Sequence, residues 1–180
     1  MARVSHIQEE SHPELAELIA VLRGGRAGRL LNIYRMLLHS PPLATSWFGH
    51  VNAVRWQTEL DGKTREIAII RVGLLNAVDY VVETHSRTYA LQEGLTPEQC
   101  VALTDWQQSP LFDEQQRAVL ALTDAMTREV QVSDSVFDEL RRYFSERQIV
   151  ELAVLIGTYN MHTRVLAALQ IDSEAAASVS

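Results

Sequence analysis

The sequence predicts an all-helical protein without a β-sheet, folded as a single-domain bundle of about eight helices. Apolar residues recur three and four positions apart along most of the chain, which is the spacing of one helix face. Several of these segments begin with residues that cap helix N-termini: Ser40 before Pro41, and the patterns Thr96–Gln99 and Ser145–Gln148. A length of 180 residues suits one domain with a buried core.

The predicted helices follow one another closely. The first two occupy residues 13–22 and 29–38 and are joined by a break at Gly24-Gly25; a third runs from Pro41 to Asp61-Gly62, where glycine can end a helix. Two more span about 64–76 and 79–94, and the rest start near residues 96, 118, 136 and 145. The β-branched run 67–72 could also form a strand, but its apolar spacing suits a helix better.

Composition excludes several classes of function. A formal net charge of -7 without a basic cluster disfavours nucleic acid as a partner. No apolar stretch is long enough to cross a membrane, and the polar N-terminal segment lacks a signal-peptide core, so we expect a cytoplasmic protein. The single cysteine, Cys100, excludes an internal disulfide, and its expected role is that of a small buried apolar residue. His6, His12 and His39 lack metal-ligand spacing, so no metal site is expected.

One acid–base pair lies on the two consecutive helices at 64–76 and 79–94. Glu66 is near the start of the first, and His85 lies in the middle of the second on its apolar face. The small residues Gly73 and Ala77 would let the two helices approach each other and bring the pair together. A carboxylate beside the imidazole is expected to raise the pKa of His85 and to fix its tautomer. From spacing alone, a structural Glu–His bond is the more common explanation.

The stretch 65–95 resembles the carboxymuconolactone decarboxylase and alkylhydroperoxidase D superfamily, and residues 144–171 resemble its final helix. The resemblance covers about 30–171, which implies a family domain there, an N-terminal helical extension at 1–29 and a flexible tail at 172–180. It also implies an alkylhydroperoxidase D-like bundle that forms a homo-oligomer, a trimer or a hexamer. The matching motifs are Arg65-Glu66, Asp79-Tyr80, His85 with Tyr89-Ala90, and Gly94-Leu95-Thr96 with Glu98.

The thiol-peroxidase branch of this superfamily is characterised by the order Glu, eleven residues, Cys, two residues, Cys, three residues, His. Glu66 and His85 match the outer positions, whereas Val78 and Val81 occupy the two cysteine positions. No thiolate can form at either valine, so peroxide reduction through that disulfide is excluded. The resemblance therefore favours the decarboxylase side of the superfamily, whose members need no metal, thiol or organic cofactor.

The leading hypothesis is a lyase of aromatic catabolism that acts on a small anionic lactone or enolisable substrate. Protonated His85 would donate a proton to the dienolate left by decarboxylation, and Glu66 would orient it. Two alternatives stay open: an antioxidant peroxidase, disfavoured by the missing cysteines, and a non-catalytic helical oligomer with a structural pair. An arginine must bind the carboxylate or oxyanion, so the candidate substrate-binding residues are Arg71 and Arg164, joined by Tyr89, Tyr159 and His162.

Overall fold

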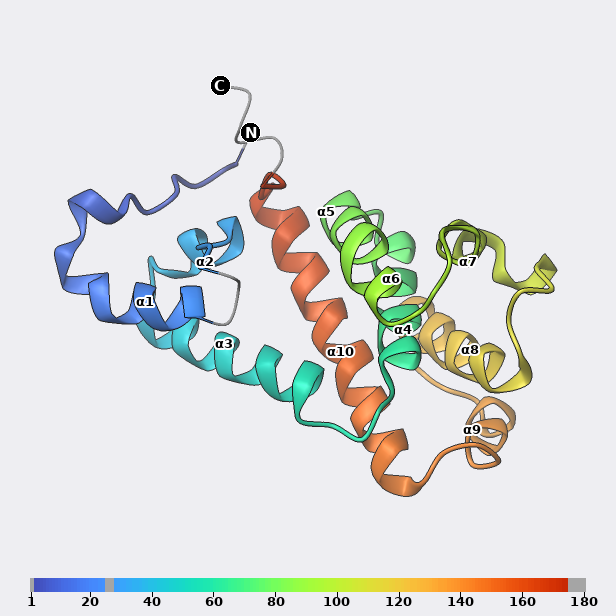
Figure 1. Cartoon of the computed structure of the whole chain (residues 1–180). Helices are drawn as coiled ribbons and strands as arrows, with labels where there is room; N and C mark the ends of the chain where they lie inside the picture. Colours follow the sequence, from blue (N-terminus) through green and yellow to red (C-terminus); the bar gives the residue numbers. More distant parts are fainter. Residues whose placement is uncertain (1, 25–27, 175–180) are drawn as a thin grey trace. The chain divides into compact units, whose positions relative to one another are not determined.

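The computed structural model describes residues 2–24 and 28–174, and over these ranges every regular element is helical (Figure 1). The predicted all-α fold is confirmed. Contacts divide the chain into two compact units, Met1–Ala53 with Val165–Ser180, and Val54–Arg164. The predicted domain boundaries after residues 29 and 171 stay a prediction. Gly25 of the predicted break and the tail from residue 175 onward lie outside the described residues.

The first unit contains α1 (Ala16–Gly24), α2 (Asn32–Leu37) and most of α3 (Pro41–Trp56), preceded by two short 3-10 turns at Glu9–Ser11 and Pro13–Leu15. Its core is apolar, with Leu22 and Ala44 fully buried and Leu38 nearly so. The predicted helix start at Pro41 is confirmed.

The loop after α3 departs from the prediction, because α3 ends at Trp56 and not at Asp61-Gly62. Asp61 is instead the N-cap of α4 (Gly62–Leu75). Its Oδ1 accepts the backbone N–H of Thr64 at 3.0 Å, and its Oδ2 accepts the Thr64 hydroxyl at 2.6 Å. The predicted helix stop at Asp61-Gly62 is therefore wrong: this dipeptide begins the next helix, because an aspartate satisfies the free N–H groups of a first turn.

We expect Asp61→Ala to lower the free energy of unfolding by about 1 kcal/mol, because the Thr64 N–H loses its acceptor. Asp61→Asn retains an acceptor oxygen and should cost less. Urea unfolding of the two variants beside the wild type measures the difference. Equal stability of Asp61→Ala and wild type would show that this cap contributes nothing to the fold.

The second unit is built around α4, which is buried on all sides from Thr64 to Gly73. It packs against α8 (Glu114–Arg128) and α5 (Asp79–Thr84). A helix covered on every side needs apolar residues all round, which explains why its sequence also has the composition of a strand. A Cβ atom on Gly73 would lie 3.0 Å from Val82 and 3.2 Å from Val81. The predicted close approach of the two helices at Gly73 is therefore present.

The predicted helix at 79–94 is present but not uniform. It consists of α5, a π-helical turn at His85–Tyr89, and α6 (Ala90–Gln92). At the end of that turn the backbone N–H of Ala90 donates to the carbonyl oxygen of His85, five residues earlier. Single π turns inside α-helices are frequent at functional sites. His85 and Tyr89, two of the predicted site residues, are the first and last residues of this turn.

The remaining elements of this unit are α7 (Pro97–Ala102), a 3-10 helix at Leu103–Gln108, α8, α9 (Asp134–Leu140) and α10 (Glu146–Leu169), whose last residues belong to the first unit. The capping box predicted at Thr96–Gln99 is confirmed, and Ser145 and Gln148 exchange the corresponding hydrogen bonds at the start of α10. A third capping box, between Asp113 and Gln116, begins α8. Among the described residues, no helix is both long and apolar enough to cross a membrane.

Candidate active site

Glu66 and His85 meet inside the second unit. Glu66, in the first turns of α4, has no exposed surface, and the side chain of His85 is 7% exposed. The imidazole Nδ1 lies 2.5 Å from Glu66 Oε2. The two side chains point toward each other, as the spacing predicts. Since a carboxylate only accepts hydrogen bonds, Nδ1 carries the proton of the neutral ring, and Nε2 is left with its lone pair.

Burial lowers the pKa of His85 below its ordinary value of 6.5. Glu66 raises the His85 pKa, but burial outweighs this effect, and the positive charges of Arg55 and Arg65 lower the pKa further. Burial would raise the pKa of Glu66, whereas His85 and the two arginines lower it below its usual value. At neutral pH the pair is thus an ionised carboxylate and a neutral imidazole. The carboxylate thus raises the His85 pKa as expected, but the net shift is downward, because desolvation of the charged ring outweighs it.

The lowered His85 pKa predicts a loss of stability in mild acid. Below about pH 6.5 the unfolded chain protonates this histidine before the folded chain does. The free energy of unfolding therefore decreases as the pH falls from about 6.5 toward the pKa of His85 in the folded protein. The decrease is up to about 1.4 kcal/mol per pH unit. Glu66, with a lowered pKa, adds a loss only below about pH 4.5.

Chemical unfolding of wild type and His85→Gln at pH 5.5 and 7.5 measures this contribution. The other histidines titrate in both proteins, so the difference between the two pH dependences isolates His85. The wild type should lose more stability than the variant between these two pH values. An identical loss in both would show that His85 has an ordinary pKa in the folded state.

Two of the residues predicted to bind substrate, Tyr89 and Tyr159, contact His85, and a third, His162, contacts Tyr159. The Tyr159 hydroxyl, from α10, lies 3.5 Å from His85 Nε2, and its ring meets the imidazole edge-on at 5.4 Å. The Tyr89 ring lies 5.2 Å from the imidazole, and the His162 ring lies 5.6 Å from that of Tyr159. A separation of 3.5 Å is long for a hydrogen bond. The Tyr159 hydroxyl therefore engages the Nε2 lone pair only weakly.

Two buried arginines, Arg55 and Arg65, complete the site, and no sequence pattern predicted a role for either. Arg55 Nη2 and Arg65 Nε lie 3.7 and 3.6 Å from Glu66 Oε1, at ion-pair distance but too far for hydrogen bonds. Arg65 also pairs with Glu93 at 2.6 Å. Burial alone would lower the pKa of Arg55, but Tyr159, Glu66 and Tyr89 keep it above its ordinary value. The sequence did contain one indication that Arg55 is buried: it follows Val51 by four residues, which places both on the buried side of α3.

The aromatic residues Trp56 and Tyr89 cover these arginines. The Arg55 guanidinium carbon lies 4.5 Å from the Trp56 ring centre and 4.2 Å from that of Tyr89. The corresponding distance from Arg65 to Trp56 is 5.0 Å. Trp56 is half exposed, so it separates the buried charges from solvent. Cations over ring faces are stabilised by the aromatic quadrupole.

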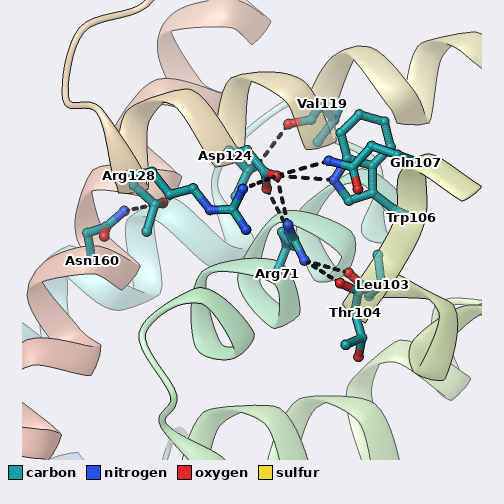
Figure 2. A network of polar contacts seen from close by, with 11 residues as sticks. Arg71, Leu103, Thr104, Trp106, Gln107, Val119, Asp124, Arg128 and Asn160 are labelled. Carbon is teal, nitrogen blue, oxygen red and sulfur yellow. Dashed lines mark hydrogen bonds and ion pairs between the residues drawn. The ribbon is translucent and has the colours of Figure 1, made fainter.

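Arg71 and Arg164, the two arginines predicted to bind substrate, do not join this cluster. Arg71 Nε and Nη2 bind the two carboxylate oxygens of Asp124 at 2.6 and 2.7 Å (Figure 2). Its Nη1 donates to the carbonyl oxygens of Leu103 and Thr104. Arg71 thereby ties α4 to α8 and to the 3-10 helix, and Asp124 occupies its anion-binding edge. Arg164 is exposed and donates to the Asn160 carbonyl oxygen of its own helix.

The thiol positions of the peroxidase pattern are apolar and buried. Val78 is the N-cap residue of α5, and Val81 is 1% exposed. Burial and the Glu66 charge raise the pKa of Cys100, so its thiol stays protonated and a poor nucleophile. Within residues 2–24 and 28–174, no group of three or more His, Cys, Asp or Glu side chains is arranged to hold a metal ion.

The fold and this site define an all-helical protein with a buried acid–base pair and no paired thiols. Residues 41–125 match the model of the carboxymuconolactone decarboxylase family. This match covers just under half of the chain, the fold is alkylhydroperoxidase D-like, and the sequence contains no CxxC motif.

Proteins similar to this chain include the uncharacterised YnjA of Escherichia coli, 27% identical over 121 residues, or 67% of this chain and 66% of YnjA. A protein of unknown function from Agrobacterium tumefaciens, ATU0492, superposes with a TM-score of 0.72 at 25% identity, over 77% of this chain and 94% of that one. The alkylhydroperoxidase AhpD core of Ralstonia eutropha gives a TM-score of 0.80 at 17% identity, over 96% and 92% of the two chains. At that identity the likeness shows the fold alone.

Proposed function

We propose that this protein is a cofactor-independent acid–base enzyme of the lyase type, acting on a small anionic lactone or enolisable substrate. The observation that carries the proposal is the 2.5 Å contact between His85 Nδ1 and Glu66 Oε2, which orients the ring and leaves Nε2 for proton transfer. Arg55 and Arg65 are buried cations beside the pair, suited to a substrate anion or an oxyanion. We further propose a cytoplasmic homo-oligomer, a trimer or a hexamer.

The pair supports proton transfer at carbon in both directions. Neutral His85 takes a proton from the carbon beside a carbonyl group, the C–H electron pair enters the enolate, and the resulting imidazolium is stabilised by Glu66. In a decarboxylation the electron pair of the C–CO2 bond enters the dienolate and CO2 leaves. The imidazolium of His85 then donates its proton to the dienolate carbon, and solvent replaces that proton.

The peroxidase alternative lacks its nucleophile. With Val78 and Val81 at the cysteine positions and Cys100 held protonated, no described thiol can attack a peroxide or form the required disulfide. The complete burial of Glu66 favours a different competitor, a structural pair in a non-catalytic oligomer. The experiment below separates these alternatives.

The test is a panel of lactone acids from aromatic catabolism, enolisable keto acids and organic hydroperoxides supplied with a dithiol. We expect turnover of a lactone or keto acid by the wild type, its loss in His85→Ala, and peroxide consumption at the background rate. His12→Ala, a change at a histidine of the first unit, is the matched control and should retain the wild-type rate. If His85→Ala turns over every substrate at the wild-type rate and loses only stability, the pair is structural.

A further inference from the structure

One edge of the Arg55 guanidinium is buried without a hydrogen-bond acceptor. The Arg55 side chain is 5% exposed, and both Nε and Nη2 lack an acceptor at hydrogen-bond distance. These two nitrogens form the edge that binds a carboxylate through two parallel hydrogen bonds. Arg71 uses the same two atoms to hold Asp124 at 2.6 and 2.7 Å. At Arg55 the carboxylate oxygen that faces this edge, Glu66 Oε1, lies 3.7 Å from Nη2 and makes no hydrogen bond to it.

The charges around this edge indicate which ligand fits. Arg55 and Arg65 carry two positive charges, and Glu66 and Glu93 carry two negative charges, so the cluster is neutral while His85 is neutral. A single added negative charge is compensated when His85 gains one proton. A dianion would leave an uncompensated charge in a buried site, which is costly.

We infer that the Nε–Nη2 edge of Arg55 binds the carboxylate of a small monocarboxylate, and that His85 takes up one proton as this ligand binds. The inference rests on the proposed function, because it names the substrate class of the same site and gives Arg55 the role of recognising it. It also explains how a resting neutral His85 becomes the acid of a decarboxylation. His85 takes this proton from solvent when the substrate binds.

His85 is the group positioned to accept that proton. Its Nδ1 contacts the Glu66 carboxylate, so the added charge is stabilised at once. Arg55 and Arg65 oppose protonation through their positive charges, and a bound carboxylate would neutralise part of that field. Among the described residues, three titratable side chains contact His85 itself: Glu66 on α4, Tyr159 on α10 and Tyr89 on the π turn. Arg55 on α3 and Arg65 on α4 lie beside Glu66. Cys100 on α7 contacts Ser86, the residue after His85.

The body of the ligand is suggested by the rings beside Arg55. Trp56 and Tyr89 both lie against its guanidinium, at 4.5 and 4.2 Å, and Trp56 is half exposed. Flat aromatic surfaces favour a planar, unsaturated ligand body over a branched one. Benzoate therefore serves as a probe, and benzamide has the same shape without the charge.

The experiment is isothermal titration of the full chain with benzoate between pH 6.5 and 8.5, in HEPES and in Tris, whose ionisation enthalpies differ. We expect saturable benzoate binding with an uptake of about one proton, and a Kd that rises about tenfold per pH unit between the free-state and the bound-state His85 pKa. His85→Gln should bind benzoate without proton uptake. Benzoate and benzamide binding equally, no benzoate binding, or binding without proton uptake by the wild type would each overturn the inference.

Arg55→Lys retains the positive charge but loses the two-nitrogen edge. It should weaken benzoate binding about tenfold or more. Arg142→Lys, at an exposed arginine paired with Glu139, is the matched control and should bind as the wild type does. If Arg55→Lys does not fold, the wild-type proton uptake and the benzoate–benzamide comparison still decide the question.

Failure of this inference is distinguishable from failure of the proposed function. His85-dependent turnover of a neutral enolisable substrate, without carboxylate binding, would retain the acid–base enzyme and remove the carboxylate site. Proton-linked benzoate binding without turnover of any panel substrate would retain the site and remove the enzyme.

Discussion

Replacing Glu66 with glutamine is expected to lower the rate of the proposed proton transfer by about 10²–10⁴-fold. The amide can still accept the His85 Nδ1–H, so the ring need not move, but the imidazolium formed during the reaction loses the negative charge 2.5 Å away. The variant should therefore lower kcat more than it raises KM. Its pH–rate profile should also shift, because the His85 pKa falls further when Glu66 is neutral.

The measurement is a steady-state rate against pH for the panel substrate that the wild type converts fastest. Glu83→Gln is the matched control, because this exposed glutamate on α5 pairs only at 3.7 Å with Arg87 and should leave the rate unchanged. Circular dichroism must show that the Glu66→Gln variant is folded, since the change leaves Arg55 and Arg65 beside a neutral side chain. An unchanged rate and pH profile in the folded variant would remove Glu66 from the chemistry.

Arg71→Met is expected to lower the free energy of unfolding by about 3 kcal/mol or more. It removes two charge-assisted hydrogen bonds from Asp124 and the donors to two carbonyl oxygens (Figure 2). The side chains of Arg71 and Asp124 are only 4% and 12% exposed. Trp106 Nε1 and Gln107 Nε2 still donate to Asp124, at 3.3 and 3.5 Å, but neither carries a charge.

Arg128→Met is the matched control, because this exposed arginine reaches the same carboxylate at 3.6 Å. A surface pair of this kind contributes about 0–1 kcal/mol. The double variant Arg71→Met with Asp124→Leu removes both buried charges and should recover most of the lost stability. Urea unfolding of the wild type, Arg71→Met, Arg128→Met and the double variant measures these changes. Equal losses in Arg71→Met and Arg128→Met would contradict a dominant role for the buried pair.

The helical fold and the Glu66–His85 contact could be predicted because both follow from local patterns. Apolar spacing and capping residues act within a few positions, and nineteen residues across a tight turn suffice to place two helix faces together. The Asp61-Gly62 turn was misassigned because aspartate can cap the helix that follows, while glycine can end the one that precedes. The hydrogen bonds from Thr64 and the end of α3 at Trp56 distinguish the two.

The pKa values and charge partners of the site residues depend on burial and on residues distant in sequence. Neither can be inferred from the spacing of residues along the chain. The sign of the His85 pKa shift is decided by desolvation and by Arg55, which lies thirty residues earlier on another helix. Arg71 has the residue type of an anion-binding group, but Asp124, far along the chain, occupies its binding edge. Arg55 was overlooked because a charged residue on an otherwise apolar face is usually solvated.

The π turn at His85–Tyr89 contains one residue more than a regular helical turn would need. Deleting a single residue between these two positions would let an ordinary α-helical ladder form, because the Ala90 N–H and the His85 carbonyl oxygen would then be four residues apart and could remain partners. The helix beyond would keep its phase, whereas the same deletion in a regular α-helix would rotate everything after it by about 100° about the axis. The extra residue is thus absorbed within His85–Tyr89, and this turn should accept a one-residue deletion more readily than the regular helices around it.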